Sequence, residues 1–195
     1  MLRKIISIVC IAMGILCLCG CKTSDADVPE NVVAEYRGEY ITKEVVQQNI
    51  EMFTFASGGQ VCPTEEDMLE EILTNTILFY EAERRGLTAT EEEIQTMLDM
   101  TARAYEMPET KTQLEAYFEQ YDWTYDEYIE VLKTEQLPRT IARQKLRYAV
   151  GQEYCEKHGL EFTNVNPPKE MTEAIDKYIE KLVNSEKKNV VYYEN

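Results

Sequence analysis

Apolar residues recur at spacings of three and four through most of residues 43–187, which is the period of an amphipathic helix. Thr90 with Glu93 and Thr124 with Glu127 form two capping boxes, in which the Thr and Glu side chains satisfy backbone N–H groups at a helix start. Gly and Pro residues separate the periodic segments, and Pro138 predicts a bend in the longest one. The sequence therefore predicts a mainly α fold of about six helices, covering residues 43–57, 64–85, 90–107, 108–121, 124–155 and 170–187.

Short β-prone runs lie at both ends of the helical region. VVAEYRGEYIT, residues 32–42, predicts two strands around a turn at Arg37-Gly38, followed by Thr42 as the cap of the first helix. Residues 190–193, Val-Val-Tyr-Tyr, predict a final strand. In the first helix, the spacing predicts a core-facing side formed by Val45, Val46, Asn49, Ile50 and Phe53.

Residues 1–20 are typical of a secretory signal, because Arg3 and Lys4 precede an uncharged apolar run that is short for a membrane span. The run ends in Leu18-Cys19-Gly20-Cys21, which resembles the lipobox of bacterial lipoproteins and implies a lipid on Cys21. An ordinary cleaved signal without lipid is the alternative. Residues 21–31 then read as the lipidated cysteine and a polar, acidic tether, and residues 32–195 as one folded domain.

Charge excludes nucleic acid as a partner. The whole chain has a net charge of −16, and removal of Arg3 and Lys4 with the signal leaves 18 basic against 36 acidic residues, near −18. Such a field repels phosphate backbones and anionic lipid headgroups. Two cysteines remain beyond the tether, Cys62 and Cys155; two unlinked thiols are favoured, with a disulfide as the alternative.

Residues that could support catalysis are few. His158 is the single histidine, so no His-based zinc site is possible, and no metal or other cofactor is expected. Because His158 precedes Gly159 at the end of a long helix, a capping role is favoured over a general base. Acidic runs such as residues 65–67 and 91–93 fall in first helical turns, where the helix dipole favours negative charge, and they lack the spacing of a calcium loop.

Met and aromatic residues are abundant on this acidic chain, which has thirteen tyrosines and eight methionines. One interpretation is that they form the hydrophobic core. The other is a cleft for apolar segments of other proteins, since flexible thioethers and aromatic rings suit promiscuous surfaces. The candidates for such a cleft are Met97, Met100, Tyr105, Met107, Tyr117, Phe118, Tyr121 and Trp123.

Four segments, in order, resemble the SurA and PrsA family of extracytoplasmic chaperones. The resemblance covers residues 32–195, although Arg37 and Tyr40 stand where the family more often has Asn and Pro. It implies an orthogonal multi-helix chaperone domain with a small β element, in which the last strand returns to the first. The segments are VVAEYRGEYITKEVVQQNI, EEILTNTILFYEAERRGLTATEEEI, LEAYFEQYDWTYDEYIEVLKTEQL and AIDKYIEKLVNSEKKNVVYYEN.

Family members commonly carry a parvulin-type prolyl isomerase domain before the closing helix, where this chain has only the loop-like residues 158–171. The resemblance therefore implies no catalysis, and instead a lipid-anchored protein on the extracytoplasmic face of the cell membrane that binds unfolded or newly exported polypeptides in an apolar cleft. One alternative is an interaction module that docks one specific envelope partner. Another is a prolyl isomerase with an unrecognised site.

Overall fold

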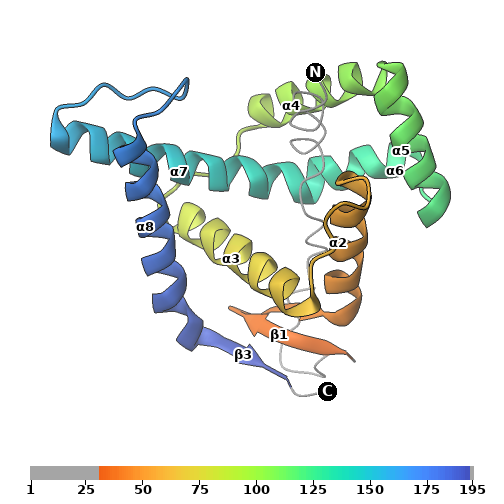
Figure 1. Cartoon of the computed structure of the whole chain (residues 1–195), viewed down its shortest axis with the longest axis horizontal. Coiled ribbons are helices and arrows are strands. Elements are labelled where there is room, and N and C mark those ends of the chain that lie inside the picture. The colour runs from red at the N-terminus through yellow and green to blue at the C-terminus, as the bar shows by residue number, and fades with distance from the viewer. Residues whose placement is uncertain (1–30, 194–195) are drawn as a thin grey trace.

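The computed structural model describes residues 31–193. A small β-sheet lies at one end of a set of helices that cross at large angles, and the long α7 runs through their middle (Figure 1). The prediction of a mainly α fold with a small β element is confirmed. The strands are β1 (Val32–Tyr36), β2 (Glu39–Thr42) and β3 (Val190–Tyr192), and the helices are α2 (Lys43–Ala56), α3 (Glu65–Arg84), α4 (Glu91–Tyr105), α5 (Pro108–Tyr121), α6 (Tyr125–Val131), η1 (Leu132–Gln136), α7 (Leu137–His158), α8 (Lys169–Glu186) and η2 (Lys187–Asn189).

The sheet has the order β2-β1-β3, with both neighbours antiparallel to β1. β1 and β2 form a hairpin whose turn, Arg37-Gly38, has φ of 54° and 80°. Positive φ at both turn positions matches the twist of the strands, but it is costly for a residue with a Cβ. The guanidinium of Arg37 lies 5.5 Å from the ring centre of Tyr36 and 5.6 Å from that of Tyr80, and these cation–π contacts offset part of that cost.

The predicted capping boxes are present at the starts of α4 and α6, and a third joins Thr64 with Asp67 at the start of α3. α6, η1 and α7 follow one another without a break, so the described residues contain six helical segments. The π-helical turn η1 ends just before Pro138. A proline ring lacks an N–H and collides with the carbonyl four residues earlier, and a wider turn relieves that collision.

The core consists of three clusters of buried residues. One joins the sheet to α2 and α3, one joins α4, α5 and α6 through aromatic rings, and one joins α3, α7 and α8. The prediction for Phe53 is wrong, because its side chain is 45% exposed and Met52 is buried in its place. The helix turns Met52 toward the aromatic rings of α5 and α6, a neighbour that the spacing within α2 alone does not reveal.

α7 and α8 pack closely at Gly151. A Cβ placed there would lie 3.2 Å from Ile175 Cδ1 and 3.2 Å from Phe162 Cε2, so the glycine sets the separation of the two helices. α7 ends at Gly159, with φ of 64°, and His158 Nδ1 lies 2.7 Å from the carbonyl oxygen of Tyr154. These contacts fit the predicted capping role of His158. Residues 159–168, within the predicted loop, contain no helix or strand.

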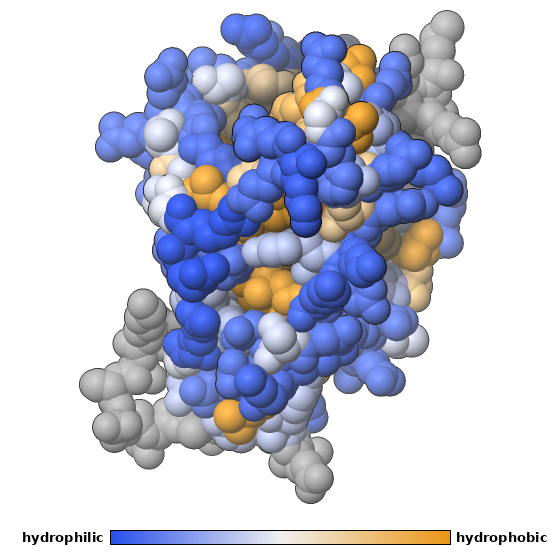
Figure 2. Space-filling view, turned by 90° about the vertical axis from the view of Figure 1, so that its left-hand side faces the viewer, coloured by the Kyte–Doolittle hydropathy of each residue, from blue (hydrophilic) through white to orange (hydrophobic). Residues whose placement is uncertain are grey.

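Hydrophilic residues cover most of the face on the α8 side, and hydrophobic residues form separate small patches between them (Figure 2). Cys21 and the predicted signal and tether lie outside the described residues. Within residues 31–193, no helix is both long and apolar enough to cross a membrane.

A hydrogen bond between Tyr36 and Glu186 joins the sheet to the end of α8. The Tyr36 hydroxyl donates to Glu186 Oε2 at 2.7 Å. This bond, and then one from Asn189, lowers the pKa of Glu186 below its usual 4.5, while burial and then the bond to Glu186 raise the pKa of Tyr36 to about 12.

A carboxyl with a lowered pKa in the folded state stabilises the fold above the unfolded pKa, and this contribution is lost as the pH falls through the folded value. We therefore expect Glu186→Gln to flatten the loss of unfolding free energy below about pH 4.5, measured by urea unfolding from pH 7 to 2.5. At high pH, a tyrosine with a raised pKa in the folded state loses its stabilising contribution as the pH rises from its unfolded to its folded pKa. We therefore expect Tyr36→Phe to flatten the loss of unfolding free energy between about pH 10 and 12. Profiles that run parallel to wild type in both ranges would contradict the assignment.

Candidate functional site

The eight predicted Met and aromatic residues lie on α4, on α5 and in the connections before and after α5, but they differ in burial. Tyr117 and Phe118 are buried within the aromatic cluster. Met100 and Met107 are exposed on the surface, Met100 by 53%. The remaining four are partly buried and pack against the edge of the cluster, namely Met97, Tyr105, Tyr121 and Trp123. Two of the eight line hollows described below, Tyr121 in one and Met97 in another, and the cleft interpretation stays a prediction.

A cleft of about 630 Å³, here called the α2–α5 cleft, lies at one edge of this cluster. Ile50, Phe55 and Ala56 of α2 and Tyr121 of α5 supply its apolar lining. Its polar rim is formed by Gln47, Glu51, Thr54, Gln113 and Gln120.

Two polar groups in this cleft have contrasting environments. The Tyr121 hydroxyl donates to Glu51 Oε2 at 2.8 Å, and burial, followed by this bond, raises the pKa of Tyr121 to about 12. The ring therefore stays neutral at physiological pH. The Thr54 hydroxyl is buried and has no hydrogen-bond partner among the described residues. A buried hydroxyl without a partner is costly, and this oxygen is covered by protein, so it weakens the packing below the cleft and does not face an incoming group.

The connection from α2 to α3 closes one end of the α2–α5 cleft. Gly58 and Gly59 have φ of 63° and 76°, a conformation that side chains with a Cβ rarely adopt. Ser57 holds the turn by bonding through its hydroxyl to both backbone groups of Val61. Cys62 lines the cleft and is exposed, while Cys155 is buried in another cluster. The two thiols are unlinked, as the sequence favoured.

A second hollow of about 470 Å³, here called the α4–α7 groove, lies between those two helices. Met97, Ile141 and Tyr148 form its apolar part. Lys145 Nζ lies 2.6 Å from Glu93 Oε2 and donates to the Thr88 carbonyl at 2.8 Å, so it ties the start of α4 to α7 at the side of the groove.

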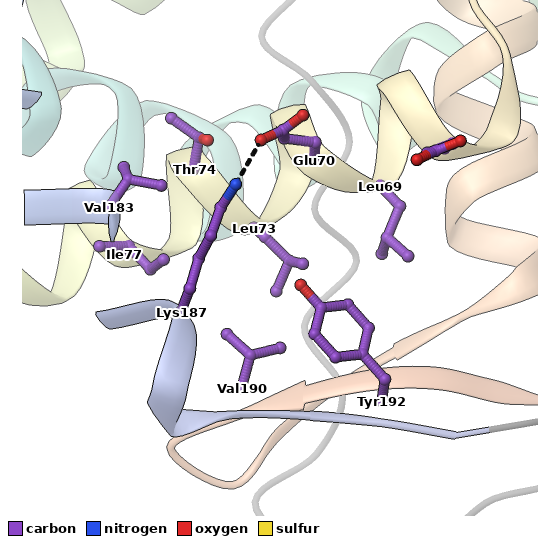
Figure 3. Close-up of a pocket in the computed structure, with 10 residues that line it drawn as sticks. Leu69, Glu70, Leu73, Thr74, Ile77, Val183, Lys187, Val190 and Tyr192 are labelled. Atoms are coloured by element: carbon purple, nitrogen blue, oxygen red, sulfur yellow. Dashed lines mark hydrogen bonds and ion pairs between the residues drawn. The ribbon is translucent and has the colours of Figure 1, made fainter. Parts of the chain in front are cut away.

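A third hollow, of about 270 Å³, lies between α3 and β3 (Figure 3). On the α3 side, Leu69, Leu73 and Ile77 alternate with the polar side chains of Glu66, Glu70 and Thr74, and Lys187 lies across from them.

Several of these lining residues were missed by reasoning from the sequence. Phe55 and Ile50 on α2, and Ile141 and Tyr148 on α7, lie in segments whose spacing predicts ordinary core residues. Their role as lining depends on α5 and α4, which approach them from distant parts of the chain. The available signal was the presence, on α2 and α7, of apolar residues outside the main buried face, which indicates a second apolar surface on the same helix.

Within residues 31–193, no group of three or more His, Cys, Asp or Glu side chains is arranged to hold a metal ion. The hollows instead combine aliphatic, thioether and aromatic surface with amides and carboxylates at their rims.

Comparison of the chain with known protein families, with curated proteins and with solved structures finds no match.

Proposed function

We propose that this protein is a lipid-anchored, extracytoplasmic, chaperone-like binder that holds unfolded or newly exported polypeptides without catalysis. The observation that supports this most is the pair of open hollows at the edges of one aromatic cluster, each with an apolar floor and a polar rim. Apolar segments of an unfolded chain fit such floors, and the rims keep the empty hollows compatible with water.

Adaptable contacts favour many different clients. Met97 in the α4–α7 groove has a flexible thioether, and Tyr148 combines an apolar ring with a hydroxyl that accepts from Gln144 at 2.6 Å. In the α2–α5 cleft, the amides of Gln47, Gln113 and Gln120 at the rim can form hydrogen bonds with any backbone. Because each hollow is small and open, binding is weak for each contact and release is fast.

Charge and anchoring complete the proposal. The net charge of −16 keeps a loaded complex soluble and favours basic clients. A lipid on Cys21, followed by the tether to residue 31, places the domain at the membrane surface where exported chains emerge. The anchoring rests on the sequence of residues 1–31.

The test is suppression of the aggregation of an unfolded client by residues 22–195, with folding checked by circular dichroism. We expect light scattering to fall at several-fold excess of the protein. Tyr148→Glu, which places a charge in the α4–α7 groove, should weaken the effect several-fold. The matched control is Val165→Glu, which adds the same charge on the exposed 159–168 loop and should leave the effect unchanged.

The α2–α5 cleft is tested separately through its thiol. A bulky maleimide should react with exposed Cys62 and not with buried Cys155, and it should reduce suppression by filling the cleft. Cys62→Ser treated with the same reagent keeps full activity if the cleft is responsible. The proposal is contradicted if the folded protein suppresses no aggregation at any excess. It is also contradicted if neither Tyr148→Glu nor maleimide labelling of Cys62 changes the suppression.

A further inference from the structure

The hollow between β3 and α3, here called the β3–α3 hollow, shares no lining residue with the α2–α5 cleft or the α4–α7 groove (Figure 3). At about 270 Å³ it lies below the range of about 300–1,000 Å³ typical of small-molecule sites. Figure 3 shows aliphatic side chains from α3, α8 and β3 converging on it from three directions. These are Leu69, Leu73 and Ile77 of α3, Val183 of α8 and Val190 of β3. The hollow therefore suits an aliphatic side chain.

Among residues 31–193, no strand pairs with the outer hydrogen-bonding edge of β3, which lies beside this hollow. The Tyr193 N–H donates to the Val33 carbonyl of β1 at 3.1 Å, and the register places Ala34 opposite Tyr192. In an antiparallel pair, hydrogen-bonded and non-hydrogen-bonded positions alternate, so Tyr192 turns its N–H and C=O away from β1. The sheet order β2-β1-β3 places β3 at an edge of the sheet.

Exposure agrees with this assignment. Tyr192 lines the hollow and its side chain is 57% exposed, and the neighbouring Val191 is also exposed on the opposite face. A strand edge with exposed apolar side chains and unpaired backbone groups is a template for another strand.

The charges at the mouth of the hollow favour a basic segment. Lys187 donates to Glu70 Oε1 at 2.7 Å, so its charge is already matched. Glu66 makes no ion pair with any residue in 31–193 and lies next to Glu65 and Asp67 in the first turn of α3. An acidic segment, such as residues 22–31 of this chain, is repelled by this wall.

We propose that the edge of β3 binds an extended segment of another polypeptide by strand addition, with an aliphatic side chain in the β3–α3 hollow and a basic side chain two positions away near Glu66. Side chains two positions apart lie on the same face of a strand, so both reach the α3 side together. The backbone bonds to Tyr192 provide affinity for any extended chain, and the hollow and Glu66 select its side chains. Binding at this site does not depend on the proposed binding of polypeptides in the α2–α5 cleft and the α4–α7 groove.

The experiment measures binding of a labelled seven-residue peptide, threonine throughout except for a central leucine and a lysine two positions later, to the full chain in detergent by fluorescence anisotropy. Tyr192→Pro removes the outward N–H but no bond to β1, since Pro is tolerated at an outward edge position. Tyr192→Thr is the matched control that keeps the N–H. We expect Tyr192→Pro to bind roughly tenfold more weakly than Tyr192→Thr, in keeping with the loss of backbone pairing.

Side-chain selection is tested with altered peptides. Replacing the central leucine with serine should abolish measurable binding. Glu66→Gln should weaken binding of the lysine peptide by roughly two- to fivefold, as expected for the loss of an exposed ion pair. It should leave the binding of a peptide with threonine in place of lysine unchanged. Equal binding by Tyr192→Pro and Tyr192→Thr, with both folded, overturns the proposal. Sedimentation that shows a dimer abolished by Tyr192→Pro assigns the edge to a second copy instead and overturns it as well.

Discussion

Arg139→Met is expected to lower the free energy of unfolding by about 3–5 kcal/mol, because it leaves the carboxylate of Glu39 buried without its cation. The side chains of Glu39 and Arg139 are 7% and 12% exposed, and Arg139 Nη2 lies 2.7 Å from Glu39 Oε2. The guanidinium also lies 4.6 Å from the ring centre of Phe79. This pair joins β2 to α7, and its loss should appear as an earlier midpoint in urea unfolding followed by circular dichroism.

A double-mutant cycle separates the ion pair from general packing. In Glu39→Gln with Arg139→Met, no buried charge remains, so the double variant should be more stable than Arg139→Met alone. Arg139→Lys keeps the charge but loses the planar contact with Phe79, and it should fall between wild type and Arg139→Met. If Arg139→Met unfolds within about 1 kcal/mol of wild type, the pair is not buried as described.

The pKa of Tyr80 reports on the charge of Glu39 in the Glu39–Arg139 ion pair. Burial, and then the charge of Glu39, raises the pKa of Tyr80 to about 12. Because the charge of Glu39 contributes to this shift, Glu39→Gln should lower the pKa of Tyr80 in an absorbance titration of tyrosinate.

Phe118→Ala is expected to destabilise the protein by about 3–5 kcal/mol, because it leaves a cavity at the centre of the aromatic cluster. Phe118 is 6% exposed, with its ring centre 5.4 Å from that of Tyr128 and 6.3 Å from that of Tyr117. Thermal or urea unfolding measures the loss, and the loss of client holding should follow the fraction unfolded.

Met100→Ala on the neighbouring α4 is the contrasting variant. Its side chain is exposed, so its unfolding free energy should change by no more than about 0.5 kcal/mol. A loss of client holding in Met100→Ala at unchanged stability would show that this methionine contacts clients. Equal destabilisation by the two variants would contradict the division of the predicted residues into core and surface.

Features with local causes could be predicted from the sequence. The Thr and Glu side chains of a capping box lie three residues apart, and the helix starts at Thr90 and Thr124 agree with prediction. The hairpin around Arg37-Gly38 and the strand from residue 190 likewise follow from short patterns. In the capping boxes and the hairpin, the partner groups lie within a few residues of each other, and the strand from residue 190 is indicated by its own β-branched and aromatic residues.

Features that depend on distant parts of the chain could not be predicted. Spacing placed Phe53 in the core, but the position of α5 selects Met52. The same limit applied to the eight Met and aromatic residues, since their period is the same whether they face a core or a groove. Glu39 and Arg139 are separated by 100 positions, and neither residue signals the other in the sequence.

The order of strands in the sheet also has a consequence for biosynthesis. β1, among the first described residues, pairs with β3, among the last, and Tyr193 donates to Glu35 across 158 positions. Pairing over such a separation is slow, because a long loop must close first. During synthesis, the β1–β2 hairpin therefore lacks its neighbour on one edge until residues 190–192 have been added, and for that time the growing chain exposes an unpaired strand edge.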